Sequence, residues 1–246
     1  MKQKIFKIIL SAVAGLLMLA AIFLVVRKNN GFQLTAVKIY NNYFVTKEDI
    51  ARLAILDFSK DLFEIDLKKM AAQISTHPMI EKVSISRFYP SVLKIRIKEY
   101  QLLTGVAGWD VVAIAETRKL IFEYTPEALY DLPMITGIHL NKNETQAGLP
   151  ENQKLLGQAV QILKMIKKSD PNLYSEISEI NFSQDNGMMF LLRKGNLPVI
   201  LGNSNYLKKL NYFATVYYYF LETKKFNQIQ TIDVRFDGEV VVKQKS

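Results

Sequence analysis

The chain has 246 residues, which is enough for one large folded domain or two small ones. It carries 32 basic against 23 acidic side chains, but no basic block alternates with aromatic residues as in a single-strand nucleic-acid groove, so we expect no nucleic-acid partner. The absence of cysteine excludes disulfides, thiolate metal centres and thiol nucleophiles, and two histidines do not favour a multi-histidine metal site. We therefore expect neither a bound metal nor a cofactor.

A long apolar run lies near the N-terminus. From Ile8 to Val26 there are 19 residues without a charge, and as a helix they match the ~30 Å thickness of a bilayer's hydrocarbon core. The apolar core of a cleaved signal peptide is usually only ~7–15 residues long. No small-residue cleavage site follows the run. The pattern predicts one uncleaved transmembrane helix over 8–26.

The residues that flank this run predict its orientation. Three lysines and the amino terminus precede it, whereas Arg27 and Lys28 follow it. Positive charge favours the cytoplasmic side, and the folded bulk of the chain comes after the run. We expect a cytoplasmic tail at 1–7, a linker at 27–33 and an extracytoplasmic remainder, held in the cytoplasmic (inner) membrane.

The region from residue 34 to residue 100 is predicted to form a small α+β domain. Residues 34–40 form a candidate strand. Thr46 and Asp66 are helix-starting residues, each followed by apolar residues at helical spacing, and the first helix is expected to reach about Phe58. The second helix must end before Pro78, because the residue before proline avoids the helical conformation.

Two more strands are predicted in this region, at 82–87 and 93–98. In the second, Leu93, Ile95 and Ile97 alternate with the basic residues Lys94, Arg96 and Lys98. Such alternation is typical of a sheet with one covered and one solvated face. The expected order is strand, helix, helix, strand, strand.

A larger mixed β domain with two long helices is predicted over 101–243, followed by a tail at 244–246. The helices are expected at 153–166 and 205–223, with a polar loop at 141–152 before the first. The predicted strands are 102–114, 120–122, 177–182, 188–192, 197–201, 230–236 and 239–243. The tyrosines Tyr217, Tyr218 and Tyr219 are interpreted as core residues of the second helix.

No catalytic site is visible. The acidic residues are scattered, and most lie at predicted turns and helix ends. His77 precedes Pro78 at a helix end, where a capping role is favoured over a general base, and His139 lies in a polar loop. We expect the protein not to be an enzyme.

Several segments of the chain carry a family resemblance: 62–66, 74–83, 87–95, 132–137, 179–180, 187, 201–202, 208–210 and 232–236. They resemble the POTRA module and the β domain of the FtsQ/DivIB family of bacterial division proteins. Met79 stands where that family usually has tryptophan, and Asn41 or Asn42 stands where it usually has glycine. Neither change conflicts with the fold, because methionine fills apolar gaps and asparagine tolerates left-handed turns.

The resemblance implies a non-enzymatic, single-span membrane scaffold of the division complex. It would bind FtsB-like and FtsL-like division proteins and link early and late components during septal wall synthesis. In the family the partner is engaged mainly by the last strands, where a peptide strand adds to a free sheet edge. The residues carried over to this role are Asp233, Arg235, Phe236, Val240, Val241 and Val242.

Alternatives remain for the site and for the function. Phe236 is either an apolar anchor for the partner or part of the inward face of a terminal strand. The stripe of Lys94, Arg96 and Lys98 is either a solvated face or a secondary surface for another membrane protein or anionic lipid.

Two other classes of protein are alternatives. One is a POTRA-bearing factor for outer-membrane protein assembly or secretion, and the other is a membrane-tethered wall hydrolase. The first usually carries a β-barrel made of many strands, whereas only 147 residues follow Glu99 and two long helices are expected among them.

Overall fold

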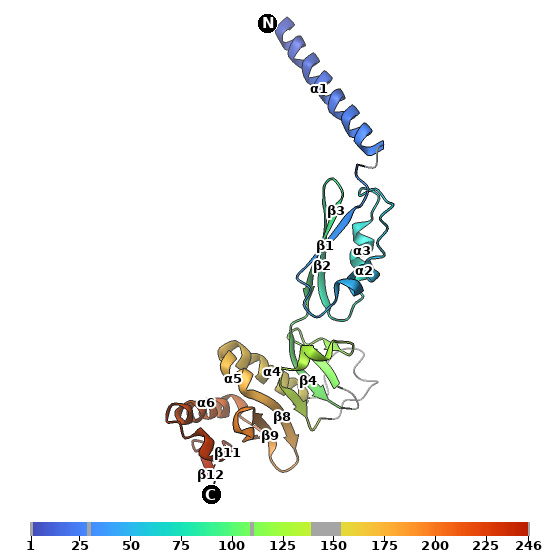
Figure 1. The fold of residues 1–246 in the computed structure, drawn as a ribbon. Helices are drawn as coiled ribbons and strands as arrows, with labels where there is room; N and C mark the ends of the chain where they lie inside the picture. The colour runs from blue at the N-terminus through green and yellow to red at the C-terminus, as the bar shows by residue number, and fades with distance from the viewer. Residues whose placement is uncertain (1, 29–30, 109–110, 139–153, 246) are drawn as a thin grey trace. The chain divides into compact units, whose positions relative to one another are not determined.

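The computed structural model describes residues 2–28, 31–108, 111–138 and 154–245. The chain divides into two compact units, Met1–Glu99 and Tyr100–Ser246, and each has its own sheet (Figure 1). The predicted polar loop at 141–152 and His139 lie outside the described residues.

The first unit begins with the helix α1, Lys2–Lys28. Its large apolar side chains between Phe6 and Val25 are mostly exposed, Leu16 to 72%. Counting only the described residues, no helix is both long enough and apolar enough to cross a membrane. The side chains of Ile8 and Val26, at the ends of the predicted span, lie outside the described ones, and the span stays a prediction.

The rest of the first unit is a two-layer α+β fold in the predicted order. The elements are β1 (Ala36–Tyr40), α2 (Lys47–Ala54), α3 (Leu67–Ile74), β2 (Ile80–Phe88) and β3 (Val92–Glu99). The central strand β3 pairs parallel with β1 and antiparallel with β2. Its residues Leu93, Ile95 and Ile97 are buried, as the alternation predicted.

Both helices of this unit begin where the sequence indicated. The Thr46 hydroxyl accepts a hydrogen bond from the Asp49 amide at 3.1 Å, and the Asp66 carboxylate accepts from two amides of the first turn of α3. These bonds satisfy amides that the helix itself leaves without partners. The first helix is shorter than predicted, because Ile55 adopts a left-handed conformation (φ 46°) that ends it after Ala54.

Glu99, the last residue of β3, forms hydrogen bonds that connect the segment after β1 to the sheet. Its carboxylate accepts hydrogen bonds from the amides of Tyr43, Phe44 and Val45 at 2.8–3.2 Å, although the residue is only 9% exposed. A buried charge is tolerated where backbone donors surround it. Glu99 thereby fixes the path of the chain into α2.

The second unit is built on a mixed sheet whose described strands lie in the order β12-β11-β10-β9-β8-β7-β4-β5-β6. Neighbouring pairs β4·β7, β7·β8 and β10·β11 are parallel, and the others are antiparallel. The strands are β4 (Leu102–Ala107), β5 (Val111–Ala115), β6 (Leu120–Ile121), β7 (Met134–Thr136), β8 (Ile177–Ser183), β9 (Gly187–Leu192), β10 (Leu197–Gly202), β11 (Ile229–Asp233) and β12 (Val241–Gln244). The helices are α4 (Lys154–Ser169), α5 (Pro171–Glu176) and α6 (Tyr206–Glu222).

Several details of this unit differ from the predictions, and three of them bear on its core and its edge. The strand expected at 102–114 is two antiparallel strands, β4 and β5, and both are apolar because both are buried in the sheet. The strand expected at 230–236 ends at Asp233. Of the three tyrosines expected in the core, only Tyr217 is buried, while Tyr218 and Tyr219 are 36% and 54% exposed.

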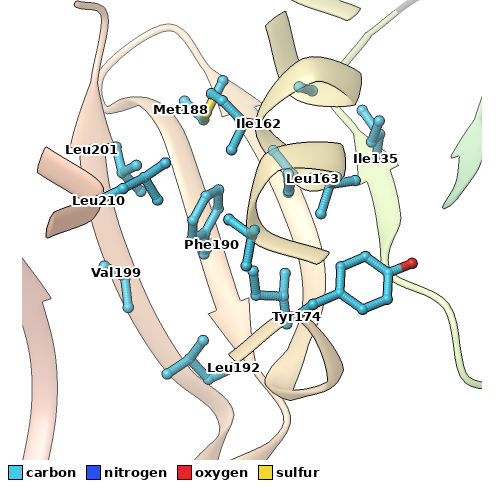
Figure 2. Close-up of a cluster of buried hydrophobic side chains, with 14 of the residues drawn as sticks. Ile135, Ile162, Leu163, Tyr174, Met188, Phe190, Leu192, Val199, Leu201 and Leu210 are labelled. Carbon is cyan, nitrogen blue, oxygen red and sulfur yellow. The ribbon is translucent and has the colours of Figure 1, made fainter. Parts of the chain in front are cut away.

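The core of the second unit lies between the sheet and its helices. Ile162 and Leu163 of α4 face Phe190 and its neighbours on the central strands (Figure 2). Phe213 of α6 packs edge-on against Phe190, with ring centroids 6.2 Å apart. The sheet is therefore covered by helices from two separate parts of the sequence.

Candidate partner-binding edge

The residues predicted to bind a partner lie around the last two strands. β11 pairs parallel with β10, and β12 pairs antiparallel with β11, so that β12 forms one border of the described sheet. Within β11 and just after it, Ile232 and Val234 are fully buried and hold the edge to the core. β12 contributes little to the core, since Val241 is 50% exposed and Val242 half-buried.

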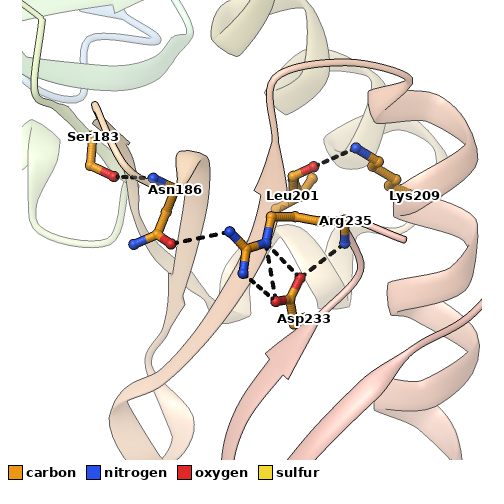
Figure 3. Close-up of polar contacts among 6 residues, drawn as sticks. All are labelled: Ser183, Asn186, Leu201, Lys209, Asp233 and Arg235. Carbon is orange, nitrogen blue, oxygen red and sulfur yellow. Dashed lines mark hydrogen bonds and ion pairs between the residues drawn. The ribbon is translucent and has the colours of Figure 1, made fainter. Parts of the chain in front are cut away.

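Arg235 lies just beyond the end of β11, where its guanidinium forms an ion pair and hydrogen bonds with the carboxylate of Asp233. Arg235 Nη2 and Nε donate hydrogen bonds to Asp233 at 2.7–3.1 Å, and the Arg235 amide donates a further bond at 3.0 Å (Figure 3). The Nη1 group reaches Asn186 Oδ1 at 3.5 Å. Arg235 was predicted to pair with a partner's carboxylate, whereas in the isolated chain its main partner is Asp233.

Asp233 was predicted to contact the partner, but its carboxylate faces its own chain. Its side chain is 13% exposed, compared with 39% for Arg235. Burial alone raises the pKa of Asp233, but the hydrogen bonds from Arg235 and the charges of Arg235 and Lys209 outweigh burial and place the pKa below its usual value. Asp233 therefore serves to orient Arg235.

Lys209 of α6 lies close enough to this pair for their charges to interact. Its Nζ donates a hydrogen bond to the Leu201 carbonyl at 2.8 Å, and the residue is 7% exposed (Figure 3). Burial lowers the pKa of Lys209, while Asp233 and Asp237 favour its charged form. Gly202 allows the close approach, because a Cβ there would lie 3.1 Å from the Arg235 side chain and the residue has a φ of +79°.

Phe236 follows in an exposed turn. It is 48% exposed and stands outside β11, so the interpretation as an inward-facing strand residue is wrong. The chain reverses through Gly238 (φ +81°), and Asp237 forms an ion pair with Lys208 of α6. Lys208 also donates a hydrogen bond to the Asp237 carboxylate, and this bond raises the pKa of Lys208. Val240, predicted as part of the pairing edge, is half-buried and precedes β12.

The Asp233–Arg235 pair has a predictable pH dependence. Because the folded-state pKa of Asp233 lies below that of the unfolded chain, its ionised carboxylate stabilises the fold above about pH 4, and this contribution is lost as the pH falls through the lower, folded-state value. We expect Asp233→Asn to lower the unfolding free energy at pH 7 and to have a smaller effect at pH 3. Denaturant unfolding of both forms at the two pH values measures this difference. A deficit that stays constant with pH would contradict it.

The predicted secondary surface lies on the open face of the β1-β3-β2 sheet. Lys94 Nζ sits 3.6 Å from the centroid of the Phe88 ring, and Lys98 pairs with Glu81 at 2.8 Å, whereas Arg96 is exposed. Lys38 and Lys82 stand opposite Lys94 and Lys98 in the neighbouring strands. The basic stripe is thus wider than the single-strand pattern indicated.

Sequence reasoning missed Asn186, Gly202 and Lys209 as parts of the edge. Their positions depend on pairings between distant strands, which no local pattern reveals. Two signals were nevertheless present in the sequence. Gly202 ends the apolar strand β10, and Lys209 lies on the face of α6 that packs against the sheet. These residues, together with the first unit, define a two-domain α+β protein with an open, polar-flanked sheet edge and the strand-helix-helix-strand-strand order of a POTRA module.

Comparison with known proteins identifies the family. The family described as "FtsQ/DivIB, C-terminal related" matches residues 120–243, and "POTRA domain, FtsQ-type" matches residues 32–100. The chain therefore belongs to the FtsQ/DivIB family of bacterial cell-division proteins.

Named relatives agree with this assignment. The cell division protein FtsQ of Geobacter sp. (strain M21) is 26% identical over 214 residues, covering 86% of this chain and 76% of that protein. FtsQ of Syntrophotalea carbinolica is 24% identical over 216 residues, covering 86% and 74%. The cell division protein DivIB of Macrococcus caseolyticus is 24% identical over 160 residues, covering 63% and 48%.

Proposed function

We propose that this protein is a non-enzymatic scaffold of the division complex that binds FtsB-like and FtsL-like proteins through the edge strand β12. The observation that carries the proposal is the border position of β12 beside the exposed Arg235 and Phe236. An edge strand offers unpaired amide and carbonyl groups to a peptide that adds as a further strand. Lys243 and the exposed neighbouring residues protect this edge from pairing with unrelated strands.

Backbone pairing alone is too weak to hold a partner on this edge. β12 has four residues, and a strand added to it would form roughly two to four hydrogen bonds worth ~0.5–1.5 kcal/mol each. Their sum falls short of the ~8 kcal/mol that micromolar affinity requires, before any cost of ordering the peptide. Side chains beside the edge must therefore supply most of the binding free energy.

Arg235 and Phe236 are the side chains suited to this role. A guanidinium has five N–H donors, so Arg235 can stay bonded to Asp233 and still donate hydrogen bonds to a partner's carboxylate. Asp233 holds the side chain in one orientation and so lowers the entropy lost on binding. The half-exposed ring of Phe236 provides an apolar anchor next to the charge.

The proposal includes a membrane anchor over 8–26 with the N-terminus in the cytoplasm. It is supported by the uncharged run in the sequence and by the exposed apolar side chains along α1, which in water would be unfavourable. Anchoring would hold the two folded units on the outer side of the cytoplasmic membrane, where septal wall synthesis takes place.

The first experiment measures binding of the chain to the host's FtsB-like protein. We expect the double variant Arg235→Glu, Phe236→Ala to lose binding, because it repels the partner's carboxylate and removes the apolar anchor. The matched control is Arg118→Glu, Phe122→Ala, which makes the same changes at exposed residues beside β6, at the opposite border of the described sheet. Calorimetry or surface plasmon resonance gives the affinities, and circular dichroism verifies that both variants are folded.

Each outcome has a definite meaning. Loss of binding in the edge variant alone supports the site. Equal binding by both variants moves the site away from β12 and leaves the scaffold role. Absence of binding by the unmodified chain contradicts the proposed partner.

A further inference from the structure

Exposed aromatic rings gather at one end of the first folded unit. The β2–β3 turn and the start of β1 lie at this end, since Ala36 and Phe88 both pair with Val92 (Figure 1). We call this group the aromatic tip. It consists of the exposed residues Phe58, Phe63, Phe88 and Tyr89 and the half-buried Phe32.

Three rings of the tip, those of Phe32, Phe63 and Tyr89, pack on one another without being fully buried. Ring centroids lie 5.2 Å apart for Phe32 and Phe63 and 5.3 Å apart for Phe63 and Tyr89. Phe63, Phe88 and Tyr89 nevertheless stay 40%, 53% and 52% exposed. An apolar cluster of this kind at the surface of a small domain indicates a contact surface.

The loops that carry the rings are held in place. Arg87 donates hydrogen bonds from Nε to the Leu62 carbonyl at 2.8 Å and from Nη2 to the Ile65 carbonyl at 2.7 Å. The Leu62 amide donates to the Phe32 carbonyl at 2.8 Å. The tip is therefore a preformed surface, and little conformational entropy is lost when it makes a contact.

The connection to α1 fixes how far the tip can lie from a membrane. Three residues, 29–31, separate the end of α1 at Lys28 from Phe32. A fully extended chain covers at most ~3.6 Å per residue, so Phe32 lies within about 14 Å of Lys28. The polar headgroup layer on each side of a bilayer is roughly 5–8 Å thick. If α1 spans the membrane, the tip is held within reach of the headgroups.

We propose that the aromatic tip docks into the headgroup layer of the lipid bilayer that α1 crosses. Aromatic side chains favour this layer because their rings are apolar and their edges or hydroxyls are polar. Charge does not favour an anionic surface here, since Asp57, Asp61 and Glu64 lie in the same loops as Lys60. The rings carry the interaction, and zwitterionic lipid is sufficient. This inference rests on the membrane anchor of the proposed function.

Docking would set the orientation of the first folded unit against the membrane. Phe23 of α1 already contacts the tip, with ring centroids 5.4 Å from Phe32 and 6.1 Å from Phe63. Insertion of the exposed rings into the headgroup layer would further restrict rotation of the unit about this connection. The opposite end, which includes Tyr43 and Ser75, would then point away from the lipid, because β2 runs from Ile80 at that end to Phe88 at the tip.

The absence of cysteine in the sequence makes the test direct. Full-length chains with Ser59→Cys at the tip or Ser75→Cys at the opposite end, both exposed, are labelled with an environment-sensitive fluorophore and reconstituted into zwitterionic vesicles that contain headgroup-nitroxide lipid. We expect quenching of the label at 59 and little quenching at 75. In a Phe63→Ser, Tyr89→Ser background the difference between the two labels is expected to be lost. The control Tyr43→Ser, at a residue 83% exposed, is expected to keep it.

Vesicle flotation separates failure of the docking from failure of the anchor. A chain that floats with the vesicles but shows equal quenching at both positions overturns the docking and leaves the anchor. A chain that does not float overturns both. Retained quenching in the Phe63→Ser, Tyr89→Ser background overturns the role of these rings.

Discussion

Replacing Phe190 with alanine is expected to destabilise the second unit by about 3–5 kcal/mol, the usual cost of removing a fully buried aromatic ring. Phe190 is 1% exposed and lies in β9, between β8 and β10. Its ring meets Phe213 of α6 and faces α4, so its loss leaves a cavity that neither helix can fill without moving (Figure 2). This position therefore joins the sheet to both of its long helices.

Hydrogen exchange followed by mass spectrometry measures this effect within the second unit. Protection of the most stable amides in β8–β10 is expected to fall by roughly two to four orders of magnitude, since ~1.4 kcal/mol corresponds to a factor of ten. Phe122→Ala is the control, because that ring is 40% exposed and its removal should change stability by only about 0.5 kcal/mol. A similar, small loss in both variants would show that the packing around Phe190 is not what stabilises the unit.

Replacing Glu99 with alanine is expected to destabilise the first folded unit by about 2–4 kcal/mol. Three backbone amides lose their acceptor, and each unsatisfied donor in a buried position costs about 1–3 kcal/mol, although water can reach some of them after the change. Glu99→Gln should recover only part of the loss, because an amide offers one acceptor oxygen instead of two.

The measurement for Glu99 is exchange of the amides of residues 43–45 and of β3. Both regions are expected to exchange faster in Glu99→Ala, with the amides of 43–45 most affected because they lose their bonds directly. Glu64→Ala, a change at an exposed carboxylate, is the control. Unchanged protection of residues 43–45 would mean that these amides are held by other groups.

Local patterns predicted those parts of the fold that local interactions decide. Thr46 and Asp66 begin helices because their side chains bond to nearby amides, and the alternation in β3 reflects a strand with one face covered. The prediction of one strand at 102–114 was wrong for a related reason. β4 and β5 are both buried and apolar, so they resemble one continuous run, although Gly108 and Asp110 lie between them in the sequence. The short helix α5 has too few residues to show a helical period.

For the candidate site, the sequence indicated a region of the chain but not the contacts that its residues make. The family resemblance indicated the last two strands, and β12 does lie at the border of the sheet. The sequence did not predict the hydrogen bonds between Arg235 and Asp233. Whether Arg235 reaches a carboxylate of its own chain depends on where β11 ends, and no local pattern shows that end point. That point, after Asp233, is set by packing of Ile232 and Val234 and by the turn at Gly238.

The strand order of the second unit also has a consequence for folding. Hairpins such as β4–β5 and β8–β9 join neighbours in sequence and can form early, whereas the parallel pair β10·β11 needs the long crossover through α6. β12 can reach its place only after β11 has done so. We therefore expect the surface proposed for partner binding to be the last part of this unit to form, so that chains whose folding is incomplete would have no edge to which a partner could bind.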